Sequence, residues 1–293
     1  MSFNDNTKMS GSAVYTIGGC GKNDGLAISK AEGGDSQYAY GLDINTSFTE
    51  EDLLTISLVQ GNSSNSFLKE MDSAKNNASG TIQVESAYYS RPVGPATMTI
   101  GPLLDQDDVV AATLSKYSDS FMLAALPYSK VKASPAQRRI GSLSFMSTTT
   151  GPGIGFSYSA DNGNKYSASA VYGGTDRKHD SSIFDSDYLS KTVSVGHDGD
   201  KFGGGLIYFH GGKKSIMNYE SLAIGGYYSP DAVDATVSLA IDNIIDSKMW
   251  TDRTDIFLGV DYEYGPGTIN AACFGQRYKK TAAAKKAGLK NYN

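Results

Sequence analysis

The chain alternates apolar and polar residues over stretches of about ten residues, and turn residues separate these stretches. The apolar members of three such stretches are Tyr38, Tyr40, Leu42 and Ile44, then Ile154, Phe156 and Tyr158, then Ile256, Leu258, Val260, Tyr262 and Tyr264. Successive side chains of a strand point to opposite faces, so each stretch predicts a β-strand with one apolar and one polar face. We expect thirteen such strands, centred near residues 14, 42, 56, 85, 97, 156, 168, 192, 206, 222, 237, 259 and 273.

Three features favour a membrane barrel over a soluble sandwich. The apolar rows often begin or end in Tyr or Phe, as in the aromatic girdles of barrels. Short turns, such as Ser90–Pro92, Asp161–Gly163 and Ser229–Asp231, alternate with longer connections. Closure would also remove the long apolar edges of an open sheet. We therefore predict one all-β domain over residues 1–293, a transmembrane antiparallel β-barrel.

The strand number follows from the parity of bacterial barrels, which is even. We expect fourteen strands, and twelve or sixteen are also compatible with the pattern. The fourteenth would come from Ile140–Met146 or from the tail near Leu289–Tyr292. Residues 279–293 are accordingly either a solvated basic tail or the last strand. About eight strands are filled by side chains and 16–18 leave an aqueous channel, so fourteen predict a narrow pore.

Composition narrows the classes of function. No apolar run approaches the roughly 20 residues of a membrane helix. This does not argue against a barrel, because transmembrane strands alternate apolar and polar residues and contain no long apolar run. The net charge of −5, without a basic domain, argues against nucleic acid as a partner. The two cysteines lack metal-ligand spacing, and the three histidines lie in expected loops or turns without a nucleophile motif. We expect no metal, no cofactor and no catalytic residues.

The longest connection, Leu103–Arg139, is far longer than a usual hairpin loop, and loops of this length are commonly functional. Its apolar residues can anchor it: Val109, Val110, Leu114, Phe121, Leu123 and Leu126. Two placements stay open, on the outer rim or folded into the lumen. We expect the second, with the connection setting the pore constriction and with Asp107 or Asp108 capping a short helix through about Lys116.

Opposed charges on this connection would create a transverse field in the pore. The predicted constriction residues are the acidic Asp105, Asp107, Asp108 and Asp119 and the basic Lys116, Lys130, Arg138 and Arg139. The predicted lining residues, on polar strand faces, are Asp43, Glu85, Asp234, Asp261 and Glu263. These carboxylates would make the lumen mildly cation-preferring; the alternative is that water solvates them without any selective role.

Three stretches carry a resemblance to the porin domain of cyanobacterial outer-membrane porins, the carbohydrate-selective, OprB-like group often described as iron-uptake porins. They are GLDINTSFTEEDLLTISLVQGN (Gly41–Asn62), RPVGPATMTIGPLLDQDDVVA (Arg91–Ala111) and TGPGIGFSYSADNGNKYSASAVYGG (Thr150–Gly174). The resemblance implies a homotrimer in a cyanobacterial outer membrane or a plastid outer envelope. The family's usual upstream surface-layer-homology domain is not in this sequence, and the end, NYN, lacks the aromatic terminus usual in bacterial barrels.

These observations predict a porin, embedded in outer-membrane lipid, through which inorganic ions and small hydrophilic solutes diffuse passively. An alternative of another class stays open: a receptor barrel that recognises a ligand through external loops. Gly61–Ser79 and Asp242–Arg253 are the loops that would do so. Conductance in a planar bilayer separates these two classes.

Overall fold

The computed structural model describes residues 6–18, 35–62, 81–117, 150–172, 186–212, 219–246 and 252–279. These residues form thirteen strands: β1 (Thr7–Gly18), β2 (Asp35–Thr46), β3 (Leu53–Gly61), β4 (Gln83–Val93), β5 (Ala96–Asp105), β6 (Thr150–Ser159), β7 (Asn164–Tyr172), β8 (Leu189–Asp198), β9 (Phe202–His210), β10 (Tyr219–Tyr228), β11 (Ala235–Asp246), β12 (Asp252–Tyr264) and β13 (Gly267–Lys279). Two short 3-10 helices, η2 (Gln106–Asp108) and η4 (Ser186–Tyr188), accompany them.

All thirteen strands that the alternation predicts are present, each around its expected centre. Both candidates for a fourteenth strand, Ile140–Met146 and Leu289–Tyr292, lie outside the described residues. The same holds for the basic tail, apart from Lys279, which ends β13. Among the helices that the structure describes, none is long and apolar enough to cross a membrane.

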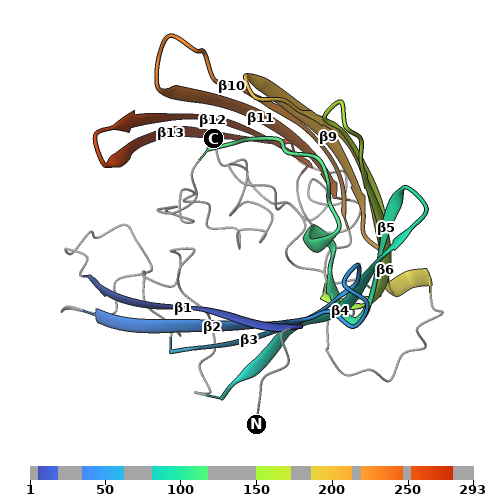
Figure 1. The fold of residues 1–293 in the computed structure, drawn as a ribbon. Helices are drawn as coiled ribbons and strands as arrows, with labels where there is room; N and C mark the ends of the chain where they lie inside the picture. The colour runs from blue at the N-terminus through green and yellow to red at the C-terminus, as the bar shows by residue number, and fades with distance from the viewer. Residues whose placement is uncertain are drawn as a thin grey trace, which may run out of the picture. The chain divides into compact units, whose positions relative to one another are not determined.

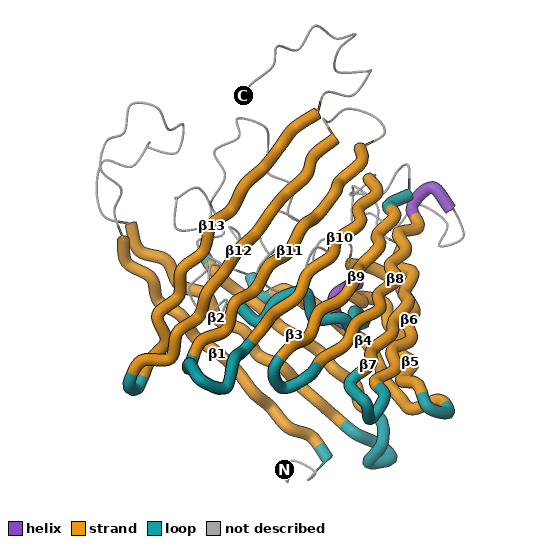
Figure 2. The backbone as a smooth tube through the Cα atoms, turned by 90° about the horizontal axis from the view of Figure 1, so that it is seen from above, coloured by secondary structure: helices purple, strands orange, loops and turns teal. Residues whose placement is uncertain are grey.

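The strands lie in the sheet in the order of the chain, from β1 to β13, and the neighbours whose register the structure describes pair antiparallel. Every second connection is short, and Figure 2 shows the short turns of β5–β13 together at one end of the sheet. One predicted turn is wrong: Ser90–Pro92 belongs to β4, and the chain reverses at Gly94 and Pro95. The reason is the backbone of Gly94, whose φ of 61° is open to glycine at little cost.

The described strands fall into two compact units. The first contains β1–β3 and β4 as far as Arg91. In this unit, Tyr38 and Tyr40 lie on one face of β2, whereas Ala39, on the other face, is 6% exposed. The pairing of β3 with β4 shifts after Ser57, and Glu85 is the extra residue of this bulge.

The second unit begins at Pro92 and contains β5–β13. Its strands expose an apolar face and bury the opposite face, which carries many polar or small residues together with a few apolar ones such as Ile207 and Phe209. On β11, for example, Leu239 is 49% exposed and Ile241 37%, whereas Ser238 and Ala240 are each 1% exposed. The buried face is the one that the chain segment after β5 contacts. We call it the inner face and the opposite, apolar face the outer face.

Figure 1 shows the segment after β5, in green, running along the concave side of the curved strands β9–β13. This segment, Gln106–Tyr117, is part of the longest connection of the chain and ends at the last residue that the structure describes there. Its position explains why the inner face is buried. The segment and the inner-face residues that contact it form the candidate functional site.

Candidate functional site

The segment begins with a turn that is capped from both sides. A register shift between β5 and β6, from Gly101 to Leu104, brings Leu104 to the inner face, where it is fully buried. Asp105 then caps η2: its side chain accepts the backbone N–H of Asp108, and the Asp108 carboxylate accepts the N–H of Asp105 at 3.2 Å. Thr150 donates a further hydrogen bond to Asp105, at 3.1 Å. The capping residue is thus Asp105, not Asp107 or Asp108.

Glycines on the strands make room for the segment. An added Cβ on Gly155 of β6 would lie 2.5 Å from a methyl group of Val109. On Gly205 of β9 it would lie 2.8 Å from Cβ of Ala112. The full set of glycines whose Cβ would meet the segment within 3 Å is Gly155, Gly196, Gly205, Gly225 and Gly259. We call these five residues the glycine track, because the segment lies where their side chains would otherwise be.

Serines beside the glycine track bind the backbone of the segment. The N–H of Ala111 donates to Oγ of Ser167 at 3.2 Å, and that of Ala112 donates to Oγ of Ser194 at 3.3 Å. The N–H of Lys116 donates to Oγ of Ser238 at 3.1 Å. Buried N–H groups require a partner, and here the strands supply it instead of a helical turn. The helix predicted through Lys116 is therefore wrong beyond Asp108.

Apolar packing fixes the far half of the segment. Ala112 and Leu114, 0% and 1% exposed, join one cluster with inner-face side chains of β9–β12: Ile207, Phe209, Ala223, Ala240 and Phe257. The ring of Tyr117 packs edge-on against Phe257, with centroids 5.3 Å apart. Burial raises the pKa of the Tyr117 hydroxyl, and the nearby charge of Asp261 raises it further. Tyr117 is thus a neutral, packed end to the described segment.

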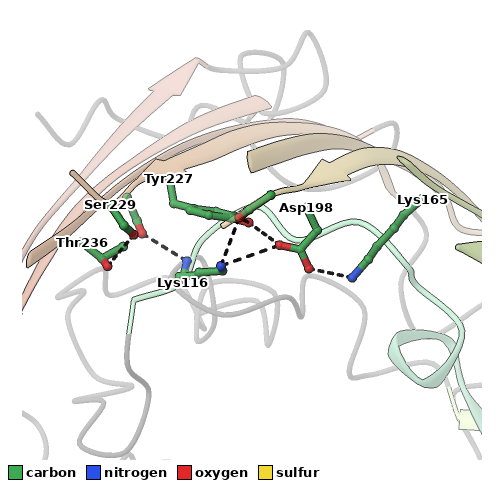
Figure 3. A network of polar contacts seen from close by, with 8 residues as sticks. Lys116, Lys165, Asp198, Tyr227, Ser229 and Thr236 are labelled. Atoms are coloured by element: carbon green, nitrogen blue, oxygen red, sulfur yellow. Dashed lines mark hydrogen bonds and ion pairs between the residues drawn. The ribbon is translucent and has the colours of Figure 1, made fainter. Parts of the chain in front are cut away.

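A polar network holds Lys116, as Figure 3 shows. Its ammonium lies 3.9 Å from the Asp198 carboxylate, 3.5 Å from the Gly199 carbonyl and 4.2 Å from the centre of the Tyr227 ring. Asp198 also pairs with Lys165 at 2.7 Å and accepts a hydrogen bond from the Tyr227 hydroxyl. All these strand residues lie near the short-turn end of β7, β8 and β10. We call Lys116, Lys165, Asp198 and Tyr227 the latch.

The predicted constriction residues divide into three groups. Asp105, at the end of β5, and Asp108 stabilise the turn that opens the segment, and Lys116 lies on the segment and belongs to the latch. Asp107 is in η2, and its side chain is not among those described. Four lie outside the described residues: Asp119, Lys130, Arg138 and Arg139. The field across the pore therefore stays a prediction.

The predicted lining residues are mostly on polar faces. Asp261 is 8% exposed on the inner face of β12 and accepts a hydrogen bond from Asn270, and Glu263 follows it on the same face, exposed. Asp43 is exposed on β2 and accepts the Ser57 hydroxyl at 2.6 Å. Asp234 lies in the turn before β11, because that strand begins only at Ala235. Glu85, as a bulge residue, does not follow the alternation that placed it.

Sequence reasoning missed the glycine track and three of the four latch residues. Both had a signal in the sequence. Gly155 and Gly259 occupy polar-face positions of strands, and Asp198 ends a strand at a short turn, whereas the longest connection begins at the other end of the strands. Neither signal says what lies against these residues. Among the described side chains, no group of three or more His, Cys, Asp or Glu could hold a metal ion.

Comparisons with known proteins define the fold. An engineered variant of the Rhodopseudomonas blastica porin is 12% identical, with a TM-score of 0.59 over 94% of this chain and 86% of that chain. The OmpF porin of Salmonella typhi, solved with daunomycin, is 12% identical, with a TM-score of 0.54 over 95% of this chain and 81% of that chain. No protein-family model and no curated protein sequence matches. The chain thus has the fold of outer-membrane porins, as the alternation predicts.

Proposed function

We propose that this chain is an outer-membrane porin through which inorganic ions and small hydrophilic solutes diffuse passively. The observation that carries the proposal is the segment Gln106–Tyr117, docked on an inner face that holds buried serines and apolar side chains, in a sheet whose outer face is apolar and exposed. Such a sheet suits lipid on one side and water on the other. A segment fixed to the water-facing inner face narrows the pore permanently, without a conformational change.

The longest connection, residues 103–139, would set the constriction. Its described part is held by the glycine track, by strand serines and by the latch, so that the segment keeps a fixed distance from the wall. Within the latch, the Lys116 side chain is 40% exposed and that of Lys165 27%, so both side chains are partly accessible to a passing solute. Asp198 lies between them and offsets part of their charge. We propose that these charges, with Asp107 and Asp108, tune the ion preference.

Further elements of the proposal go beyond the fold. We propose that residues 1–293 form a single barrel, because one porin chain aligns with 94% of this chain, across both units. The location in a cyanobacterial outer membrane or plastid outer envelope, and assembly as a homotrimer, are supported only by the resemblance of three sequence stretches to cyanobacterial porins. Crosslinking of the detergent-solubilised protein tests the trimer.

Planar-bilayer recording under a salt gradient tests the function. We expect stepwise currents through an open, ohmic channel. The double variant Asp107→Asn with Asp108→Asn should shift the reversal potential toward anion preference, because two carboxylates leave the predicted constriction. A matched control, Asp161→Asn with Asp231→Asn, removes the same charge from exposed short turns. A closed barrel that binds a ligand tightly would support the receptor alternative instead.

A further inference from the structure

The two rims of the outer face of β6–β13 differ in chemistry. Aromatic side chains dominate the rim at the short turns: Tyr158, Tyr166, Phe202, Tyr228, Tyr262 and Tyr264, all 37–67% exposed. Tyr158 stacks on Tyr166 with ring centroids 6.2 Å apart, and Tyr262 stacks on Tyr264 at 6.4 Å. This rim matches the uncharged aromatic girdle that barrels place at a membrane interface.

The opposite rim carries a row of polar and charged side chains. Lys191 lies directly across from His210, which lies across from Glu220. The row continues on β11–β13 through Asn243, Thr254 and Arg277. Thr254 is paired in register with both of the others and donates a hydrogen bond of 3.1 Å to Asn243. We call these six residues the polar row.

The charges of the polar row are not balanced within it. His210 Nδ1 lies 3.0 Å from Oε1 of Glu220, so the acidic member already has a partner. Lys191 and Arg277 are exposed, and within the part of the chain that the structure describes neither has an ion pair. Two cations therefore stand at the edge of an apolar face with their charge available.

The spacing of the rims fits a bilayer. From Phe202 to His210 on β9 the chain runs about 26 Å at roughly 3.3 Å per residue. With the usual tilt of about 40°, this is about 20 Å along the barrel axis, close to the apolar band of about 25 Å. The outer face between the rims is apolar, with Val193, Leu222 and Ile224 each 46–56% exposed. The polar row thus falls at headgroup depth.

We propose that the polar row binds phosphate-bearing anionic lipid headgroups at the long-connection rim through Lys191 and Arg277. The proposal rests on the membrane function proposed above. Acyl chains cover the adjacent apolar face, so a headgroup attached to them meets these cations without leaving the bilayer. A lysine supplies a point charge and an arginine a planar fork for phosphate oxygens. Among the described residues the aromatic rim carries no such row, so the two leaflets would be distinguished by charge.

Tryptophan quenching by brominated lipids tests this proposal. Trp250 is the only tryptophan, so Trp250→Phe gives a silent background. Leu222→Trp then reports on the polar-row side of β10, and Tyr228→Trp reports on its aromatic rim. Each reporter is reconstituted in brominated phosphatidic acid and in brominated phosphatidylcholine. We expect phosphatidic acid to be preferred at the Leu222→Trp reporter and not at the Tyr228→Trp reporter.

Lys191→Gln should lower that preference about fivefold, which corresponds to about 1 kcal/mol for one basic residue at an anionic surface. Lys201→Gln, which removes an exposed lysine from a short turn, is the matched control and should change nothing. Equal preference at both reporters, or an unchanged preference in Lys191→Gln, would overturn the proposal. So would loss of quenching by both lipids, which would mean that another protein copy covers this face. Conductance of the same proteins separates the two proposals, because an active channel without lipid preference refutes only this one.

Discussion

The two faces of β11 follow the same period of two, but the inner face buries small and polar residues whereas the outer face exposes apolar ones. Ser238 and Ala240, on the inner face, are 1% exposed, whereas Leu239 between them is 49% exposed. In a water-soluble sheet the apolar face is the buried one. The difference teaches that the chain's own segment covers the inner face, whereas the described residues leave the outer face exposed. Four changes would break or sharpen this contrast.

The largest effect is expected from a charge on the outer face. Leu239→Arg should destabilise the folded barrel by about 2–4 kcal/mol, the cost of an arginine near the bilayer midplane. Urea titration of the protein in lipid vesicles measures this loss. The matched variant Thr97→Arg places the same side chain at an exposed inner-face position of β5 and should cost little. Equal losses in the two variants would refute the assignment of the faces.

A clash on the inner face comes next. Gly155→Val would drive a side chain into Val109 and should weaken docking of the segment by about 1–3 kcal/mol, as overpacking does. Single-channel conductance should change as the segment leaves the wall. Adding Val109→Ala removes the clashing methyl groups and should restore most of the original conductance. If the second substitution rescues nothing, the segment does not pack on this glycine.

A smaller effect is expected from the latch. Asp198→Asn weakens the contacts that hold Lys116 and Lys165, and a partly exposed ion pair contributes at most about 1 kcal/mol. We expect little loss of global stability but more flicker in the open-channel current. Asp231→Asn breaks the exposed pair with Lys201, away from the segment, and provides the control. The latch has no role in the pore if both variants flicker alike.

The smallest effect concerns a turn between strands, outside both faces. Asp52 accepts backbone N–H groups of Phe48 and Thr49, each at 2.8 Å, and the Tyr89 hydroxyl, whose hydrogen bond holds the pKa of Asp52 well below its ordinary value of 3.8. A lowered pKa stabilises the turn above the ordinary value, and this stabilisation is lost as the pH falls through the lowered pKa. The protection factors of the Phe48 and Thr49 amides, which correct for the intrinsic pH dependence of exchange, should therefore fall at acidic pH. In Asp52→Asn this pH dependence should vanish; its persistence would point to another group.

Much of the fold was predictable because alternation is a local property. The stretch from Ile256 to Tyr264 shows its apolar face in the sequence alone, and the structure exposes that face on β12. Boundaries were less predictable: Asp234 lies in a turn and not in β11, and Gly94 moved the β4–β5 turn. The first depends on where the pairing of β11 with β12 begins, and the second on the positive φ of Gly94; a hydrophobic pattern encodes neither.

The candidate site was predictable only in outline. The length and apolar content of the connection pointed to a docked segment, but its partners lie far away in the chain. The hydrogen bond from Lys116 to Ser238 joins residues 122 positions apart. The sequence predicts a helix capped by Asp107 or Asp108 because a capping acid is a local signal, whereas the serines that replace the helical partners are distant in the chain.

The sequence by itself determined the strands, their two faces and the longest connection, because each follows from neighbouring residues. Only the tertiary structure decided where that connection lies, because the glycine track is made of residues from β6, β8, β9, β10 and β12. These glycines form one path only after the strands pair in register. That a glycine makes room for a segment can be inferred only when the neighbours of that glycine in space are known.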